Sequence, residues 1–139
     1  TDRKVVAHEN TDIAFSPDWI AGSVLRYTHQ GIFLSGDKSD RIELMYFQKY
    51  VGEQFIDNTQ SDERKLDAYT LGDIRLDYTL KNVMFKELTA YVLVRNIFNT
   101  EYESNAWVYR YHDGTDFQEL NGYFPQAGTN FMAGLRVSF

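Results

Sequence analysis

The chain ends in the segment Thr129-Asn-Phe-Met-Ala-Gly-Leu-Arg-Val-Ser-Phe139, in which apolar and polar residues alternate. Successive side chains of a β-strand point to opposite faces, so every second residue lies on the same face. The opposite face of this segment has Met132 as its one large apolar group, beside Asn130, Arg136 and Ser138. The segment is therefore predicted to form a strand with two different faces. The apolar face consists of Phe131, Ala133, Leu135, Val137 and Phe139.

Two interpretations account for such a strand. A soluble barrel or sandwich would bury the apolar face in its core and leave the other face in water. An outer-membrane barrel turns its apolar face to lipid and its polar face to an aqueous interior. The spacing of apolar residues before the final aromatic residue also resembles the terminal signal by which outer-membrane barrels are recognised for assembly. We therefore favour the membrane interpretation, with the assembly signal carried by Phe131, Leu135, Val137 and Phe139.

Composition limits the function of the chain. Aromatic residues make up 16% of the 139 residues, which suits strands, membrane interfaces and adaptable binding loops. The net charge is −6 with no basic stripe, so nucleic acid is not expected as a partner. Cysteine is absent, which excludes disulfides, thiol nucleophiles and cysteine-based metal sites. No apolar run is long enough for a membrane-spanning helix, whereas the strands of a membrane barrel need only alternate.

Four further segments are predicted to be strands, because apolar and polar residues alternate along them. The clearest begins near Tyr69, where Ile74 and Leu76 alternate with charged residues. No segment carries the periodicity and capping residues of an α-helix. The charged residues from Gly36 to Arg41 are predicted as a loop. The sequence thus predicts an all-β antiparallel meander of about five long strands, at residues 19–29, 41–56, 69–80, 88–96 and 130–139.

The predicted connections alternate in length. Short turns are expected near residues 30–31 and 81–87, and long connections at 57–68 and 104–128. An antiparallel meander places every second connection at the same end of the sheet. Short turns at one end and long loops at the other are typical of outer-membrane barrels, whose short turns are periplasmic. We therefore expect Phe139 to lie at the short-turn end.

Several segments together resemble the carboxy-terminal part of a TonB-dependent outer-membrane receptor. The resemblance covers nearly the whole chain in the expected order. It implies the last part of a 22-stranded transmembrane β-barrel, which in that family is plugged by an amino-terminal domain. We expect residues 1–139 to be this carboxy-terminal portion, without the plug domain and the earlier strands. The most specific piece is Asn96-Ile-Phe-Asn-Thr-Glu-Tyr102. Besides the last strand, the matching segments are Ile13–Trp19, Tyr50–Thr59, Leu66–Leu71, Val94–Tyr102 and Tyr123–Gly128.

The resemblance implies an active importer of a scarce ligand, such as a siderophore, haem or cobalamin, in the outer membrane of a Gram-negative bacterium. The implied partners are outer-membrane lipid, the rest of the barrel and plug, TonB through the plug, and the barrel-assembly machinery. Two alternatives remain open. One is a soluble β-barrel or sandwich that binds a small apolar ligand. The other is a small, complete outer-membrane barrel of about eight strands, which needs more strands than we find in the sequence.

The long connection at 104–128 contains the best candidates for ligand contact. Tyr and Trp are rigid and amphipathic, so they bind ligands at low entropic cost. A self-packing loop or an aromatic girdle at the membrane interface is the alternative interpretation. The candidate ligand-contact residues are Trp107, Tyr109, Tyr111, Phe117 and Tyr123.

Charged residues of the clearest internal strand form a second candidate set. Asp73, Arg75 and Asp77 recur at a spacing of two, and the central Arg offsets the two carboxylates. This pattern favours a ladder facing the lumen over a catalytic pair of carboxylates. His112 has acidic neighbours without the fixed spacing of a metal site, and no nucleophile-and-base signature occurs. We therefore expect no metal, no cofactor and no enzymatic activity.

Overall fold

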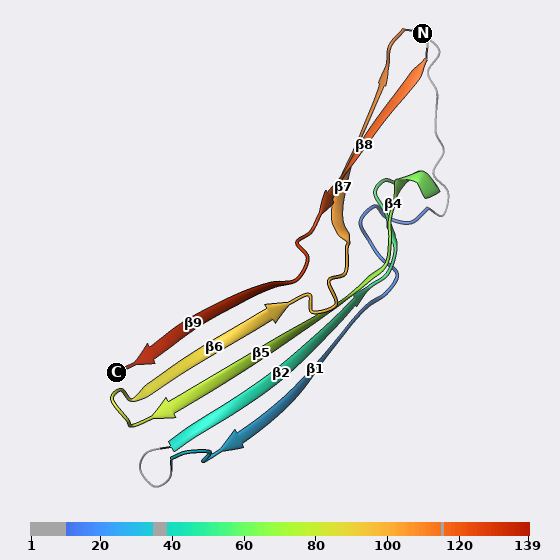
Figure 1. Ribbon diagram of the computed structural model, residues 1–139. Helices are drawn as coiled ribbons and strands as arrows, with labels where there is room; N and C mark the ends of the chain where they lie inside the picture. Colours follow the sequence, from blue (N-terminus) through green and yellow to red (C-terminus); the bar gives the residue numbers. More distant parts are fainter. Residues whose placement is uncertain (1–10, 35–38, 115) are drawn as a thin grey trace. The chain divides into compact units, whose positions relative to one another are not determined.

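The computed structural model describes residues 11–34, 39–114 and 116–139. Within this part of the chain the regular elements are β-strands and one short 3-10 turn, η1 (Asp62–Arg64), which confirms the all-β prediction. No described helix has the length and apolar composition needed to cross a membrane. The main sheet has five strands in the order β1-β2-β5-β6-β9 (Figure 1). These strands are β1 (Ile20–Gln30), β2 (Ser39–Val51), β5 (Tyr69–Lys81), β6 (Glu87–Arg95) and β9 (Asn130–Ser138).

The chain forms two compact units. The second unit (Ala21–Tyr50, Thr70–Thr100 and Ala127–Phe139) contains most of the five-stranded sheet. The first unit (Thr1–Ile20, Val51–Tyr69 and Glu101–Gln126) contains two small antiparallel pairs. These pairs are β3 (Gln54–Phe55) with β4 (Lys65–Leu66), and β7 (Glu103–His112) with β8 (Phe117–Pro125).

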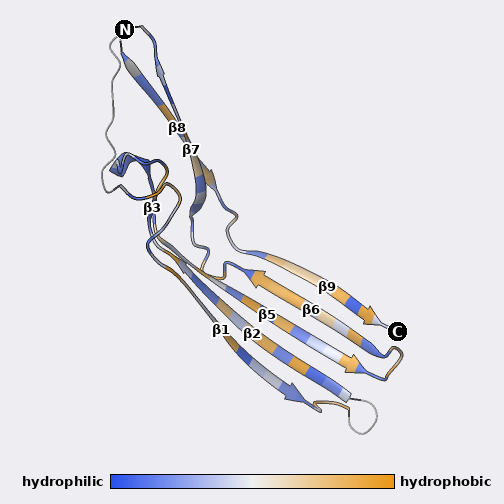
Figure 2. Cartoon of the chain, turned by 180° about the vertical axis from the view of Figure 1, so that it is seen from behind, coloured by the Kyte–Doolittle hydropathy of each residue, from blue (hydrophilic) through white to orange (hydrophobic). Residues whose placement is uncertain are grey.

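The register of β5, β6 and β9 separates apolar from polar residues on the two faces of the sheet. Val92 of β6 lies between Leu76 of β5 and Ala133 of β9, and the three residues share one face of the sheet. Apolar residues of the three strands align in the same way at every second position. Figure 2 shows hydrophobic and hydrophilic bands alternating along β2 and β5, whereas β6 is mostly hydrophobic. We call one side the apolar face. In these strands it comprises Ile74, Leu76, Tyr78, Leu80, Leu88, Ala90, Val92, Val94, Phe131, Ala133, Leu135 and Val137.

The prediction of one continuous strand at residues 41–56 is wrong. Strand β2 ends at Val51, and the chain leaves the sheet at Gly52. The Gly52 N–H donates to the Trp19 carbonyl oxygen (2.8 Å), and a Cβ at Gly52 would lie 3.2 Å from that oxygen. The strand also begins before Arg41, because residues 39–41 predicted as loop belong to β2. The remaining residues of the predicted loop, 36–38, lie outside the described part of the chain.

The long connection predicted at 104–128 is also wrong in type, because it is a β-hairpin. Its strands β7 and β8 pair from Glu103 with Pro125 to His112 with Phe117. Gly114 at the tip has φ 104°, a conformation that glycine adopts without the penalty of a Cβ. Aromatic residues at a spacing of two favour strands, and this signal outweighs the polar residues around it.

A buried asparagine ties the end of β6 to the start of β9. Asn96 is 4% exposed, and both it and Asn99 adopt a left-handed conformation (φ 51°) that Asn tolerates. The Asn96 side chain accepts from the Thr100 N–H and donates to the Thr100 carbonyl oxygen, each at 2.9 Å. The Thr129 hydroxyl donates to the Asn96 carbonyl oxygen (2.6 Å), and the Thr129 N–H donates to Asn99 Oδ1 (3.0 Å). The most specific segment of the sequence resemblance is thus a hydrogen-bonded turn.

We predict that Asn96→Ala lowers the free energy of unfolding by about 2 kcal/mol, because the Thr100 N–H and carbonyl lose their buried partner. Urea unfolding in detergent, followed by circular dichroism, measures this loss. Asn130→Ala is the control, since Asn130 is exposed and its side chain bonds to the carbonyl of nearby Gly128. Equal losses in the two variants would contradict the role of the turn.

Candidate functional site

Three of the five candidate ligand-contact residues share one face of the β7–β8 hairpin. In the register of the pair, Trp107 lies opposite Gly122, and Tyr109 lies opposite Leu120. Trp107 is 46% exposed, Tyr109 59% and Leu120 51%, so this face is open. We call it the aromatic face of the hairpin. It comprises Trp107, Tyr109, Tyr111, Gln118, Leu120 and Gly122.

The rings of the aromatic face hold defined positions. The indole of Trp107 lies across Gly122, where a Cβ would stand 2.5 Å from the indole Nε1 and 2.7 Å from Cε2. Only glycine leaves room for the ring in this position. The Tyr109 and Tyr111 rings stack along β7, with centroids 5.7 Å apart and planes inclined by 30°. The three aromatic side chains thus form an ordered row.

The opposite face of the hairpin packs against the connection at residues 52–68. Ala106 is buried in a small apolar cluster with Ile56 and Leu66. Tyr123 lies opposite Ala106 in the register, and its hydroxyl donates to the Glu63 carbonyl oxygen (3.1 Å). Tyr123 therefore belongs to the packed face. Phe117 lies opposite His112, at a position of the same face, and its side chain lies outside the described part of the structure.

Four charged residues bind the hairpin to this connection, and we call them the clasp. Arg110 contacts Asp57 (Nη2–Oδ2, 2.6 Å) and Glu119 (Nε–Oε2, 3.3 Å). Arg64 contacts the same two carboxylates, Asp57 at 3.0 Å (Nε–Oδ2) and Glu119 through Nη1. Sequence analysis missed the clasp, because Arg110 and Asp57 stand 53 positions apart and no local pattern links them.

The surroundings of Asp57 in the clasp favour the ionised form of its carboxyl. Partial burial alone would raise the pKa of the Asp57 carboxyl. Hydrogen bonds from the Thr59 N–H (2.9 Å) and hydroxyl (2.5 Å), with the charges of Arg64 and Arg110, outweigh burial and hold that pKa below its usual value. The two positive and two negative charges of the clasp cancel, so it presents no net charge to a ligand.

The charged ladder predicted at Asp73, Arg75 and Asp77 pairs internally. Arg75 donates to Asp77 through Nε (2.6 Å) and Nη2 (3.0 Å). The Arg75 guanidinium also lies 4.5 Å from the centroid of the Tyr91 ring. Asp73 lies 3.8 Å from Arg95 (Oδ2–Nε). Every charge of the ladder therefore has an opposite charge beside it, on the face of the sheet opposite the apolar face.

The two faces of the sheet show an inverted pattern of burial. On the polar face, Asp77 is 9% exposed, and Thr79 and Thr89 are 1% exposed with their hydroxyls 3.0 Å apart. On the apolar face, Phe131 is 82% exposed and Leu135 72%. The other residues of the predicted assembly signal, Val137 and Phe139, are also exposed.

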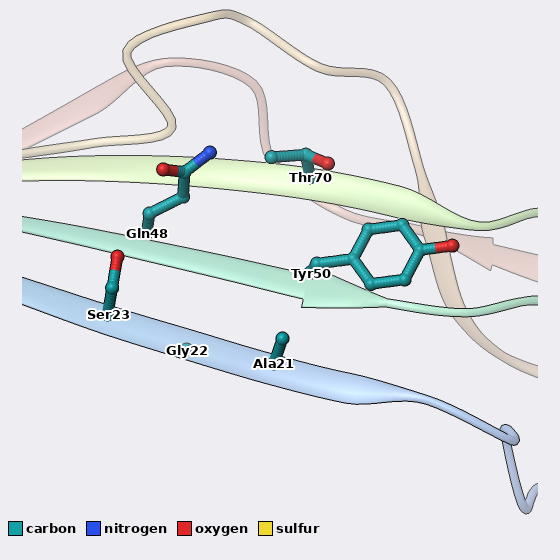
Figure 3. A pocket seen from close by; sticks show the side chains of 6 residues that line it. All are labelled: Ala21, Gly22, Ser23, Gln48, Tyr50 and Thr70. Carbon is teal, nitrogen blue, oxygen red and sulfur yellow. The ribbon is translucent and has the colours of Figure 1, made fainter.

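A shallow depression lies on the sheet where β1, β2 and β5 run side by side (Figure 3). Its lining consists of small or uncharged side chains, and Tyr50 is the one titratable residue among them. Among the described residues, no three His, Asp or Glu side chains gather closely enough to hold a metal ion. The depression is lined by Ala21, Gly22, Ser23, Gln48, Tyr50 and Thr70.

No family model, curated protein or solved structure matches this chain. Its function must therefore be argued from the residues and their geometry.

We predict that Asp57→Asn weakens the packing of the hairpin by about 1–2 kcal/mol, because Arg64 and Arg110 lose a shared, mostly buried carboxylate. Amide hydrogen exchange in β7 and β8 should accelerate about 5- to 30-fold. Asp62→Asn is the control, since the Asp62 side chain is 94% exposed. The clasp would have no stabilising role if both variants exchanged like the unmodified protein.

Proposed function

We propose that this chain is the carboxy-terminal wall of a 22-stranded barrel in the outer membrane, belonging to a TonB-dependent importer of a scarce ligand. The observation that carries the proposal is the inverted burial of the sheet. Polar residues such as Thr79 and Thr89 are buried, whereas Phe131 and Leu135 are open. An aqueous lumen on one side and hydrocarbon on the other match this arrangement.

A soluble module would bury the apolar face under a second layer. Covering one large apolar side chain contributes about 1.5–3 kcal/mol, so leaving a whole face in water is costly. Yet the buried hydrophobic residues of the described chain include none of the apolar face. They are Met45, Val51, Ile56, Leu66 and Ala106. Hydrocarbon tails of lipid are therefore the solvent that suits the apolar face.

The edges of the sheet support a barrel larger than five strands. Strands β1 and β9 are the two ends of the strand order, so each has a neighbour on one side within the described structure. In a lipid bilayer every backbone N–H and carbonyl must be paired, which requires further strands at both edges. A 22-stranded barrel supplies them from the rest of the same wall.

The lengths of the connections support one orientation of the proposed wall. The connections from β1 to β2 (residues 31–38) and from β5 to β6 (82–86) are short. The connections from β2 to β5 (52–68) and from β6 to β9 (96–129) are longer. Short turns are periplasmic and long loops external in outer-membrane barrels. The clasp and the β7–β8 hairpin would then lie outside the cell, where a ligand is captured.

The absence of cysteine allows a direct test with single cysteines that carry nitroxide labels. In membranes of cells that make the protein, labels at Ala133→Cys and Leu135→Cys should collide mainly with oxygen, which partitions into lipid. Labels at Met132→Cys and Arg136→Cys should collide mainly with a water-soluble nickel complex. Electron paramagnetic resonance measures both collision rates.

Collision rates with oxygen and with the nickel complex that alternate with a period of two along β9 support the lipid-facing wall. Equal access of the nickel complex to all four labels would refute it, as would recovery of the unmodified protein in soluble form without detergent.

A further inference from the structure

The aromatic face of the hairpin carries no charged side chain. The charges of β7 and β8 in the middle of the hairpin, Arg110 and Glu119, belong to the opposite face and are engaged in the clasp. An anionic ligand would therefore find no cation on the aromatic face, and at its tip end the Asp113 carboxylate, which accepts from Gln118 Nε2 (3.2 Å), would repel an anion. A binding surface of this composition favours an uncharged ligand.

Packing contacts hold the rings of the aromatic face in defined positions. Trp107 rests on the backbone at Gly122, so one side of the indole is packed and the other faces outward. Tyr109 and Tyr111 are stacked on each other. Tyr and Trp have few rotatable bonds, and ordered rings lose little further entropy on binding. The clasp also stabilises the arrangement of these rings, because it fixes the opposite face of the hairpin.

The row of rings is elongated and has polar edges. Trp107 and Tyr111 are four positions apart, which corresponds to about 13 Å along a strand. The indole N–H, the phenol hydroxyls and the Gln118 amide add hydrogen-bonding groups at the edges of the rings. Gln118 is held by a hydrogen bond from its Nε2 to Asp113 Oδ2 (3.2 Å). The ligand should thus be longer than one ring, with apolar faces and polar edges.

We propose that the aromatic face binds a linear, uncharged oligosaccharide. The C–H groups on the face of a sugar ring carry partial positive charge and match the negative face of an aromatic ring. Its hydroxyls project from the ring edge, where phenol, indole and amide groups can pair with them. As the capture site of an importer, this assignment rests on the function proposed above. The binding itself can be measured separately.

The experiment uses the full chain in detergent, titrated by calorimetry with four neutral hexasaccharides: maltohexaose, cellohexaose, xylohexaose and mannohexaose. We expect saturable binding of at least one of them. Tyr109→Ala and Trp107→Ala should each weaken that binding at least tenfold, because such rings dominate binding energy where they anchor a ligand. Tyr27→Ala is the matched control, since Tyr27 is 62% exposed and lies in the five-stranded sheet. Its affinity should equal that of the unmodified chain.

Trp19→Phe leaves Trp107 as the sole tryptophan and provides an independent readout. Sugar binding should then change the emission of Trp107 with the same midpoint as the calorimetric titration. A titration with the anionic oligogalacturonate hexamer should give at least tenfold weaker binding than the best neutral sugar.

The proposal is overturned if none of the four neutral sugars binds, if Tyr109→Ala binds as tightly as Tyr27→Ala, or if oligogalacturonate binds equally well. It is also overturned if light scattering shows a dimer that Tyr109→Ala dissociates, because a second copy would then occupy the face. If no sugar binds but the accessibility of the labels on β9 alternates with a period of two, the binding site is refuted and the importer is retained. Sugar binding together with uniform water access along β9 would instead refute the importer and retain the binding site.

Discussion

The strand register of β5, β6 and β9 is the constraint on which the rest of the structure depends. Residues opposite one another in an antiparallel ladder share a face, so Leu76, Val92 and Ala133 are placed together. A shift of one residue in either pairing would move a whole apolar set to the polar side. On the polar side the same register puts Tyr91 opposite Gly134, where a Cβ would stand 2.6 Å from the Tyr91 hydroxyl. Glycine at that position therefore helps to fix the pairing.

Each compact unit has a polar device that holds its irregular chain in place. In the sheet unit, Asn96 satisfies the backbone of a turn whose left-handed residues would otherwise be costly. In the other unit, the clasp joins the β7–β8 hairpin to a connection that has little apolar core of its own. Small cores need such support, because few buried side chains cannot offset the entropy of ordering a long segment. The order of the aromatic face follows from that support.

Burial connects the sheet to the proposed function. In a water-soluble protein, the groups with the least exposure are mostly apolar, whereas Thr79, Thr89 and Asp77 take that place in this sheet. Buried hydroxyls and carboxylates are tolerated because each is hydrogen-bonded, as the Thr79–Thr89 and Arg75–Asp77 contacts show. Under the proposed function, the hydrocarbon of a bilayer is the solvent of the open apolar face. The aromatic face differs, because its rings have hydrogen-bonding edges suited to a ligand in water.

The sequence by itself determined the five main strands and the difference between their faces, because a period of two is a local property of the chain. It did not reveal the break at Gly52, which depends on the carbonyl of Trp19, or the hairpin at residues 103–125. It identified Trp107, Tyr109 and Tyr111 as candidates, but only the pairing of β7 with β8 separated them from Tyr123. The clasp was decided by tertiary structure alone. Its members contact one another across long stretches of chain, and such side-chain contacts form only after backbone pairing has brought the segments together.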